Sequence, residues 1–319
     1  MAARLAGLGS LLAALTLPGP LSAEPGPSPY AEFQRREALL FENGWQLARA
    51  NRAFCKNTET SLGFLIHDAG NYGRPDAVKA ALGLEGEIAV QAVASGSPAA
   101  KSGVAPNQSL SALDGEDVQT RWPATRPTVK RTLQIEDALA RSLADGNAQL
   151  TFAGAGSSAE RVFAGVTVCT AKFRLTSGND AYAGPDTVFL GAEFAGFGMP
   201  EELLAAAIAH ELAHVLLDHP ARKEAERWGR SETRRSERVA DRMMPWLLFN
   251  AGRDPRDTAR WMRAWGPKHS GGLLRKRTHD GWDERLQMIE EEIALLEAQV
   301  LRNRWEPGEA DWASRFAED

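Results

Sequence analysis

His210, Glu211 and His214 form the pattern His-Glu-Leu-Ala-His within an apolar stretch, Ile208 to Leu217. Residues four apart on an α-helix lie about 40° apart around its axis and one turn apart along it, so the two imidazoles can reach one metal ion. Glu211 then lies beside the ion. A zinc ion with two His ligands needs a third protein ligand and keeps one position for water, whose pKa falls to about 7. The pattern predicts a zinc peptidase centre in which Glu211 is the base for that water.

The third metal ligand is expected downstream of this pattern. The spacing with Glu nineteen or twenty residues beyond the second His is not met, because Thr233 and Arg234 occupy those positions. Glu237 and Asp241 share one helical face, so Glu237 can bind the metal while Asp241 orients a ligand imidazole. Pro245 lacks an N–H and is expected to kink or interrupt this helix. Three other acidic residues of this charge-rich stretch remain alternatives to Glu237: Glu224, Glu226 and Glu232.

These residues resemble a known family, the HtpX-like and prenyl-protein-protease-like gluzincin peptidases, whose pattern is His-Glu-x-x-His followed by Glu-x-x-x-Asp. The resemblance covers residues 165 to 300 and extends over four motifs in order: Ala209 to His214, Glu237 to Asp241, Ala251-Gly252 with Asp254-Pro255, and Thr278-His279 before Glu284-Arg285. It implies a mostly helical metallopeptidase domain that binds one Zn²⁺ through His210, His214 and Glu237. It also implies that His279 helps to stabilise the tetrahedral oxyanion, with Arg285 supporting it from the following helix.

The segment before the metal helix also resembles this family. Asp180 to Gly184 and Thr187 to Leu190 look like the turn and edge strand beside the substrate cleft, which adds a small edge sheet to the expected domain. The family commonly has Asn at the position of Asp180, so this chain departs from the pattern by one negative charge. Beyond Pro18 there is no apolar run of 18 or more residues, which indicates a soluble branch of a family whose better-known members carry transmembrane helices.

The N-terminus has the pattern of a secretory signal peptide. Arg4 precedes the apolar stretch Leu5 to Leu17, and the small-residue exit Leu21-Ser22-Ala23 follows. As a helix this stretch covers about 20 Å, short of the roughly 30 Å hydrocarbon core, so cleavage after Ala23 is favoured over an uncleaved membrane anchor. We therefore expect an exported, periplasmic protein with no stable membrane span after cleavage.

Cys55 and Cys169 are the only cysteines of the chain. Because free thiols tend not to persist in an oxidising compartment, the two are expected to form a disulfide, with two unpaired buried thiols as the alternative. This disulfide would join an N-terminal helical segment to the strand that enters the catalytic domain. Neither cysteine has the spacing of a metal ligand.

A β-rich stretch precedes the metallopeptidase region. Val93 to Val104, with a Ser-Pro-Ala-Ala helix start, and Leu110 to Gly115, with an Asp-Gly turn, resemble the central segment of bacterial PDZ domains. This resemblance implies a groove that binds an extended peptide by strand addition, although the loop Leu62 to Leu65 departs from the usual Gly-Leu-Gly-Phe pattern. The predicted organisation is a signal peptide (1–23), a leader and helix (24–60), a PDZ-like domain (61–168), a zinc metallopeptidase domain (169–304) and a frayed acidic tail (305–319).

Composition and charge limit the function further. The chain is 43% hydrophobic and 25% charged, which is ordinary for a globular protein with a sizeable core. Its formal net charge of −5 gives no support for nucleic-acid binding. The remaining histidines, His67, His219 and His269, and the scattered tryptophans are assigned no function, because such residues are more often exposed or part of the core.

Together these patterns predict an α+β protein that acts as an exported, zinc-dependent endopeptidase on polypeptide substrates, in envelope protein processing or quality control. The alternative is a PDZ-centred adaptor or holdase whose zinc site is structural or vestigial. The two hypotheses differ at the metal. A fourth protein ligand such as His279 would favour the adaptor, whereas an open position for water would favour the enzyme.

Overall fold

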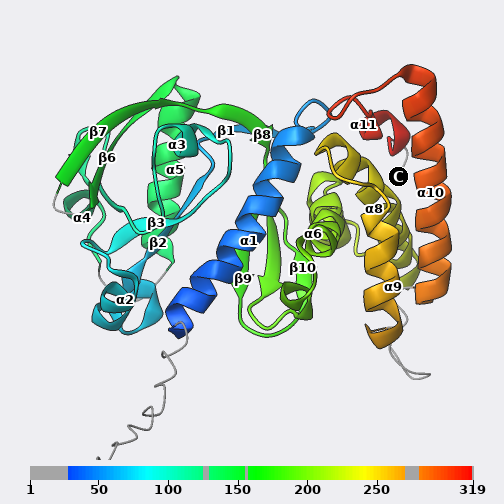
Figure 1. Ribbon diagram of the computed structural model, residues 1–319, viewed down its shortest axis with the longest axis horizontal. Helices are drawn as coiled ribbons and strands as arrows, with labels where there is room; N and C mark the ends of the chain where they lie inside the picture. The colour runs from blue at the N-terminus through cyan, green and yellow to red at the C-terminus, as the bar shows by residue number, and fades with distance from the viewer. Residues whose placement is uncertain (1–27, 125–128, 155–156, 270–279, 318–319) are drawn as a thin grey trace, which may run out of the picture.

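The computed structural model describes residues 28–124, 129–154, 157–269 and 280–317, and the predicted α+β class is confirmed (Figure 1). The predicted signal peptide and His279 lie outside the described residues. A long helix, α1 (Pro29–Ala50), lies between a β-rich part and a helical part (Figure 1). Among the described residues, no helix is both long enough and apolar enough to cross a membrane.

The β-rich part is built on an antiparallel sheet in the order β2-β3-β4-β6-β7, with β5 paired to β4. The strands are β2 (Phe64–Asp68), β3 (Ile88–Val93), β4 (Ser109–Leu113), β5 (Glu116–Asp117), β6 (Asn147–Gly154) and β7 (Ser157–Ala164). The helices are η1 (Ala69–Tyr72), α2 (Pro75–Leu82), α3 (Pro98–Lys101), α4 (Val118–Arg121) and α5 (Lys130–Ala144). Because α5 packs against β2 and β6, this part has a hydrophobic core of its own, which includes Ile135, Leu150 and Phe163.

Two turns predicted for the β-rich part are present. Ser97 accepts a hydrogen bond from the backbone N–H of Ala100 and Pro98 begins the first turn, so α3 starts at the Ser-Pro-Ala-Ala segment. Asp114 and Gly115 have φ angles of 51° and 80° between the paired strands β4 and β5. Positive φ at both central residues is what a two-residue hairpin turn requires.

The helical part carries a three-stranded sheet in the order β10-β11-β9. β11 pairs parallel with β9 and antiparallel with β10, which leaves β10 at the edge. The strands are β9 (Lys172–Thr176), β10 (Ala181–Ala183) and β11 (Thr187–Gly191). The helices are η2 (Ala195–Gly198), α6 (Glu201–Leu216), α7 (His219–Ala225), α8 (Arg230–Asn250), α9 (Asp257–His269), α10 (Trp282–Asn303) and α11 (Trp312–Arg315). The Ala- and Leu-rich α6 is buried between the sheet, α8 and α9.

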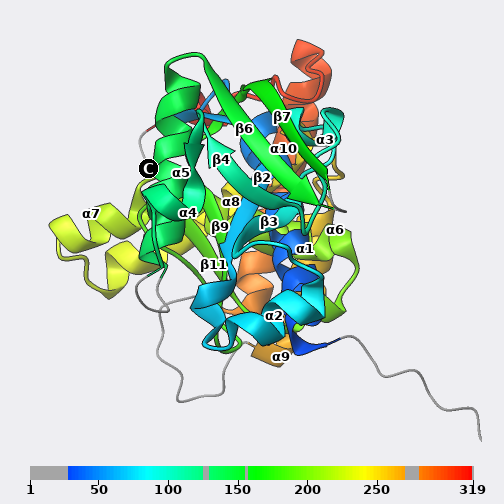
Figure 2. The ribbon, with the colours of Figure 1, turned by 90° about the vertical axis from the view of Figure 1, so that its left-hand side faces the viewer.

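The helix α1 joins the two parts by packing on both. It contacts β3 of the β-rich part, and β9 and α6 of the helical part. At Gly44 a Cβ atom would lie 2.2 Å from the ring of Phe173, so a glycine is required for β9 to pack this closely on α1. Figure 2, turned toward the β-rich side, shows the sheet and α5 in front and α7 projecting to one side.

A disulfide fastens the segment after α1 to the small sheet that connects the parts. This two-stranded sheet consists of β1 (Thr58–Ser61) and β8 (Val166–Cys169). Cys55 and Cys169 are joined, with 5.6 Å between their Cα atoms, and they are 114 positions apart in the sequence. The bond therefore closes a loop that contains the whole β-rich part.

Removing this disulfide should destabilise the protein. A cross-link that closes a loop of about 100 residues restricts the unfolded chain, and losing such a bond typically costs about 2–5 kcal/mol. We expect the double variant Cys55→Ser, Cys169→Ser to lose free energy of unfolding in this range, measured by denaturant titration. Reduction of the unmodified protein with dithiothreitol should have the same effect, and an unchanged transition midpoint in both experiments would contradict the prediction.

The helical part departs from the sequence-based expectations at two places. α8 continues through Pro245, so the helix is not interrupted there. The proline removes one backbone hydrogen bond, but the three residues that follow it are fully buried and hold the last turn against the core: Trp246, Leu247 and Leu248.

The C-terminal segment also differs from the prediction, because residues 305–317 fold against the helical part and are not a frayed tail. Trp312 is 3% exposed, and its indole N–H donates to Oδ1 of Asn51 at 2.9 Å. Asn250 donates to the same oxygen at 2.9 Å. Arg315 donates two hydrogen bonds to Glu292 of α10. Buried aromatic and amide contacts thus outweigh the acidic composition of this segment.

Candidate metal centre

The packing of α6 on α8 brings three side chains together. His210 and His214, one turn apart on α6, place their Nε2 atoms 3.3 Å apart. Glu237 of α8 places Oε2 at 3.3 Å from Nε2 of His210 and at 3.7 Å from Nε2 of His214. Both histidines are buried and Glu237 is largely buried. The three residues form a group that could hold a metal ion.

The separations of these three atoms fit a tetrahedral ion. Metal–ligand bonds of about 2.0–2.1 Å at tetrahedral angles place ligand atoms about 3.3–3.4 Å apart. The observed separations are 3.3, 3.3 and 3.7 Å. The side chains are therefore arranged for an ion without any large rearrangement of the two helices.

The alternative ligands considered from the sequence lie outside this group. Glu232 accepts a hydrogen bond from the backbone N–H of Gly229 and so caps the start of α8. Glu226 accepts a hydrogen bond from the indole N–H of Trp228. Glu224 is exposed on α7. Of the four candidates, Glu237 is the one that meets the two histidines.

Asp241 and Arg285 fix the orientation of His210. Oδ1 of Asp241 lies 3.1 Å from Nδ1 of His210, and both oxygens of Asp241 accept hydrogen bonds of 2.7 Å from the Arg285 guanidinium. Burial by itself raises the pKa of Asp241, but the charge and hydrogen bonds of Arg285, with those of His210, lower the pKa to about 2. An ionised Asp241 beside Nδ1 favours a proton on that nitrogen, so Nε2 is the ring atom that can face a metal ion.

The electrostatics of the group favour a positive charge. Burial by itself lowers the pKa of His210, but hydrogen bonds to Asp241 and Glu237 outweigh burial and raise the pKa to about 10. The carboxylates of Asp241 and Glu237 thus stabilise a positive charge on or beside His210 in this buried space, whether that charge is a proton on the ring or a bound cation.

His219 is a contact of the centre that sequence reasoning missed. Its Nδ1 lies 2.9 Å from Nδ1 of His214, and its ring is buried beside Trp228. Burial, followed by the charges of His214 and Arg222, lowers the pKa of His219 to about 3. His219 is therefore neutral, and its Nδ1 can accept the Nδ1 proton of His214. Nε2 of His214 is then left for the metal.

The sequence signal for this contact is weak. His219 follows His214 by five residues, a spacing that on a continuous helix would place the two side chains about 140° apart. Asp218 changes this, because it adopts a φ of 57° in the left-handed region and ends α6 before α7 begins. The turn brings His219 back against the metal helix.

Substitution of His219 should weaken the metal site in a graded way. His219→Phe removes the acceptor at similar volume, and loss of such an orienting contact typically lowers metal affinity about 10–100-fold. His219→Asn keeps an acceptor near the position of Nδ1 and should retain most of the affinity. Competition with a chromogenic zinc chelator measures both, and a Phe variant that binds zinc like the unmodified protein would exclude the orienting role.

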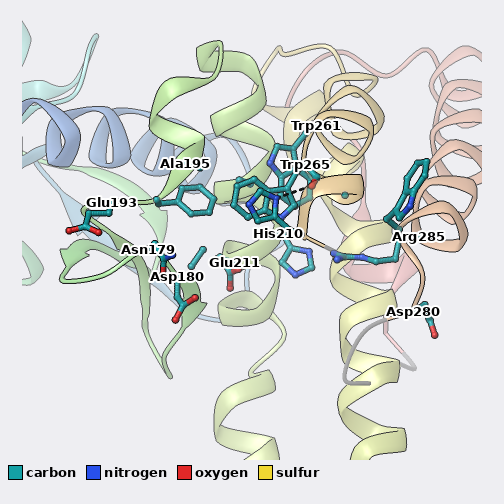
Figure 3. A pocket seen from close by; sticks show the side chains of 16 residues that line it. Asn179, Asp180, Glu193, Ala195, His210, Glu211, Trp261, Trp265, Asp280 and Arg285 are labelled. Atoms are coloured by element: carbon teal, nitrogen blue, oxygen red, sulfur yellow. Dashed lines mark hydrogen bonds between the residues drawn. The ribbon is translucent and has the colours of Figure 1, made fainter. Parts of the chain in front are cut away.

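Two cavities flank the group and share three residues, Ala181, His210 and Glu211. One cavity has a volume of about 480 Å³ and extends toward α9 and the start of α10. The other, of about 390 Å³, extends toward α7 and Trp228. Figure 3 shows Glu211, Arg285 and two tryptophans of α9 around His210. Glu211 thus faces the space on both sides of the group.

The predicted cleft elements lie beside this space. β10 is the edge strand, and Asp180 at its start lines the larger cavity. Arg285 lines the same cavity from α10. His279 lies outside the described residues, so its role at the oxyanion stays a prediction. The next residue, Asp280, accepts hydrogen bonds from Arg238 of α8.

Comparison with known proteins gives no assignment. No family model matches this chain, and no curated protein matches it significantly. The resemblance to the gluzincin peptidases therefore rests on the motifs of this chain and on the geometry of the site.

Proposed function

We propose that the protein is a zinc-dependent endopeptidase. The observation that carries this proposal is the group of two imidazole nitrogens and one carboxylate oxygen, with Glu211 beside it. Catalytic zinc sites have three protein ligands of these types and a fourth position for water, whereas structural sites are closed by four protein ligands. The group has three members among the described residues, which is the number of protein ligands that a catalytic zinc site requires.

The side chains around the group suit hydrolysis of a peptide bond. When bound, zinc lowers the pKa of water to about 7 and polarises the substrate carbonyl. Glu211 accepts a proton from the attacking water and passes it to the amine as the C–N bond breaks. Asp241 keeps His210 in the orientation that presents Nε2. We propose that His279 acts on the oxyanion, with Arg285 as a supporting residue on the following helix.

The edge strand supports a polypeptide substrate. Within the described residues, β10 pairs with β11 along one edge. An extended peptide can add to the other edge as a strand and gain main-chain hydrogen bonds. This would carry the peptide past Ala181, which lines both cavities next to Glu211.

The compartment is part of the proposal. The N-terminal pattern favours export, and the Cys55–Cys169 disulfide suits an oxidising compartment such as the periplasm. We therefore propose that the substrates are exported or envelope proteins.

The PDZ-like part would bind a peptide of a substrate or partner. The loop expected to do so, Leu62 to Leu65, packs closely at Gly63, where a Cβ atom would lie 2.3 Å from Ser97 and 2.9 Å from Trp45 of α1. A cavity of about 470 Å³ lies farther along β2, between α5 and α1. Its apolar lining includes Phe33, Tyr72 and Leu133. We propose this cavity as the place where an extended peptide adds beside β2.

The experiment that tests the peptidase is digestion of an unfolded protein such as casein by the purified mature protein. We expect fragments by mass spectrometry, their loss after a chelator is added, and their return when zinc is restored. Zinc-loaded protein that produces no fragments from casein or from a library of unfolded peptides would contradict the proposal.

A further inference from the structure

The larger cavity beside the metal group has aromatic walls. It is about 480 Å³ in volume and is lined by four aromatic side chains, from the residue before η2, from α9 and from the start of α10: Phe194, Trp261, Trp265 and Trp282. Gly266 allows α10 to approach α9 here, because a Cβ atom at this position would lie 2.6 Å from Cβ of Trp282. We call this space the aromatic chamber.

One wall of the chamber is a row of rings that begins at the metal group. Trp261, Trp265 and His269 occupy positions four residues apart on α9. The rings of Trp261 and Trp265 are stacked at 6.1 Å and 13°, and those of Trp265 and His269 at 3.4 Å and 8°. The ring of His210 lies 6.5 Å from that of Trp261. The row thus extends from the buried His210 to the exposed His269 at the end of α9. Figure 3 shows its members Trp261 and Trp265 beside His210.

Two charged residues of the chamber wall, Arg285 and Asp280, are paired with other side chains. Arg285 donates two hydrogen bonds to the buried Asp241, and Asp280 accepts two from Arg238. Glu193 and Asp180 are exposed on the opposite side, toward the start of β10. The chamber therefore suits an uncharged apolar side chain, and its acidic mouth disfavours an acidic one.

The position of the chamber along β10 gives the direction of the substrate. Asn179, Asp180 and Ala181, at the N-terminal end of β10, line the chamber, whereas Tyr182 and Ala183, farther along, line the smaller cavity. A peptide paired antiparallel to β10, the more stable arrangement, runs opposite to this strand. Its residues after the scissile bond then lie at the chamber.

We propose that the aromatic chamber binds the side chain that immediately follows the scissile bond and selects large apolar or aromatic residues at that position. This inference rests on the proposed peptidase function and adds its substrate class. Ring-on-ring contacts and the burial of apolar surface favour Phe, Tyr, Trp or Leu over Ala. Asp at this position is the least favoured.

The test uses internally quenched peptides that differ only at the residue after the cleaved bond. We expect kcat/KM for Phe to exceed that for Ala by at least about 10-fold, and Asp to lie below Ala. In Trp265→Ala the ratio of Phe to Ala should fall several-fold. In the control Trp122→Leu, which alters a half-buried indole of the β-rich part, the ratio should stay as in the unmodified protein. The unmodified protein decides the question alone if Trp265→Ala does not fold.

Equal rates for all peptides, or an aromatic preference at the residue before the bond, would overturn the inference while the peptidase function stands. Binding supplies a second measurement, because zinc-loaded Glu211→Gln should bind the Phe peptide more tightly than the Ala peptide in calorimetry. If that preference is measured but no peptide is cleaved by the unmodified protein, the chamber stands and the peptidase function fails. Absence of both preferences overturns the chamber.

Discussion

Glu211→Gln should lose turnover while zinc stays bound. The amide keeps the size and shape of the side chain but cannot accept a proton, and a positioned general base contributes about 10²–10⁴-fold to the rate. Glu211 is outside the group that could hold the ion, so the ligands remain intact. We expect kcat on a quenched peptide to fall within that range, with one zinc per chain retained by elemental analysis.

The matched control for this variant is Glu224→Gln, which removes an exposed carboxylate on α7 and changes the net charge by the same amount. Its kcat should equal that of the unmodified protein. Turnover retained in Glu211→Gln, at equal zinc content, would mean that another group takes the proton from the water.

Glu237→Ala should lose the metal. Its carboxylate is one of three ligand atoms, and the two histidines alone leave the ion with incomplete protein coordination. Loss of a hydrogen-bond partner that orients a ligand lowers metal affinity about 10–100-fold. Loss of the ligand itself should therefore lower metal affinity more than about 100-fold. Competition with a chromogenic chelator measures the affinity, and the activity should fall in parallel.

Glu224→Ala is the control here, and circular dichroism of both variants shows whether the helices remain. This variant is informative because the same charge-rich stretch contains three alternative candidates for the third ligand: Glu224, Glu226 and Glu232. Unchanged zinc affinity in folded Glu237→Ala protein would show that the third ligand is a different residue.

The local part of the metal site could be predicted from the sequence because it depends on helical periodicity. His210 and His214 fall on one face of α6, and Glu237 and Asp241 on one face of α8, whatever the rest of the chain does. The meeting of these two faces depends on tertiary packing. Helical periodicity does not predict that the faces of α6 and α8 meet. The motif spacing and the resemblance to a family do predict it.

Contacts made by turns and by distant segments were missed. His219 reaches His214 because the backbone of Asp218 is left-handed, a conformation that is uncommon for residues other than glycine. Trp312 is held by Asn51, 261 positions away in the sequence. No local pattern encodes either contact. Composition alone therefore predicts a frayed tail for a segment that packs on the core, and it assigns no function to His219.

We propose above all that this chain holds an open, catalytic zinc site. A crystal structure of the zinc-loaded protein, with the ion located by its anomalous scattering, tests this most directly. We predict one ion bound by Nε2 of His210, Nε2 of His214 and Oε2 of Glu237, with the fourth position taken by water next to Glu211. A fourth protein side chain in that position, or an ion bound elsewhere, would contradict the account and favour a structural metal in an adaptor.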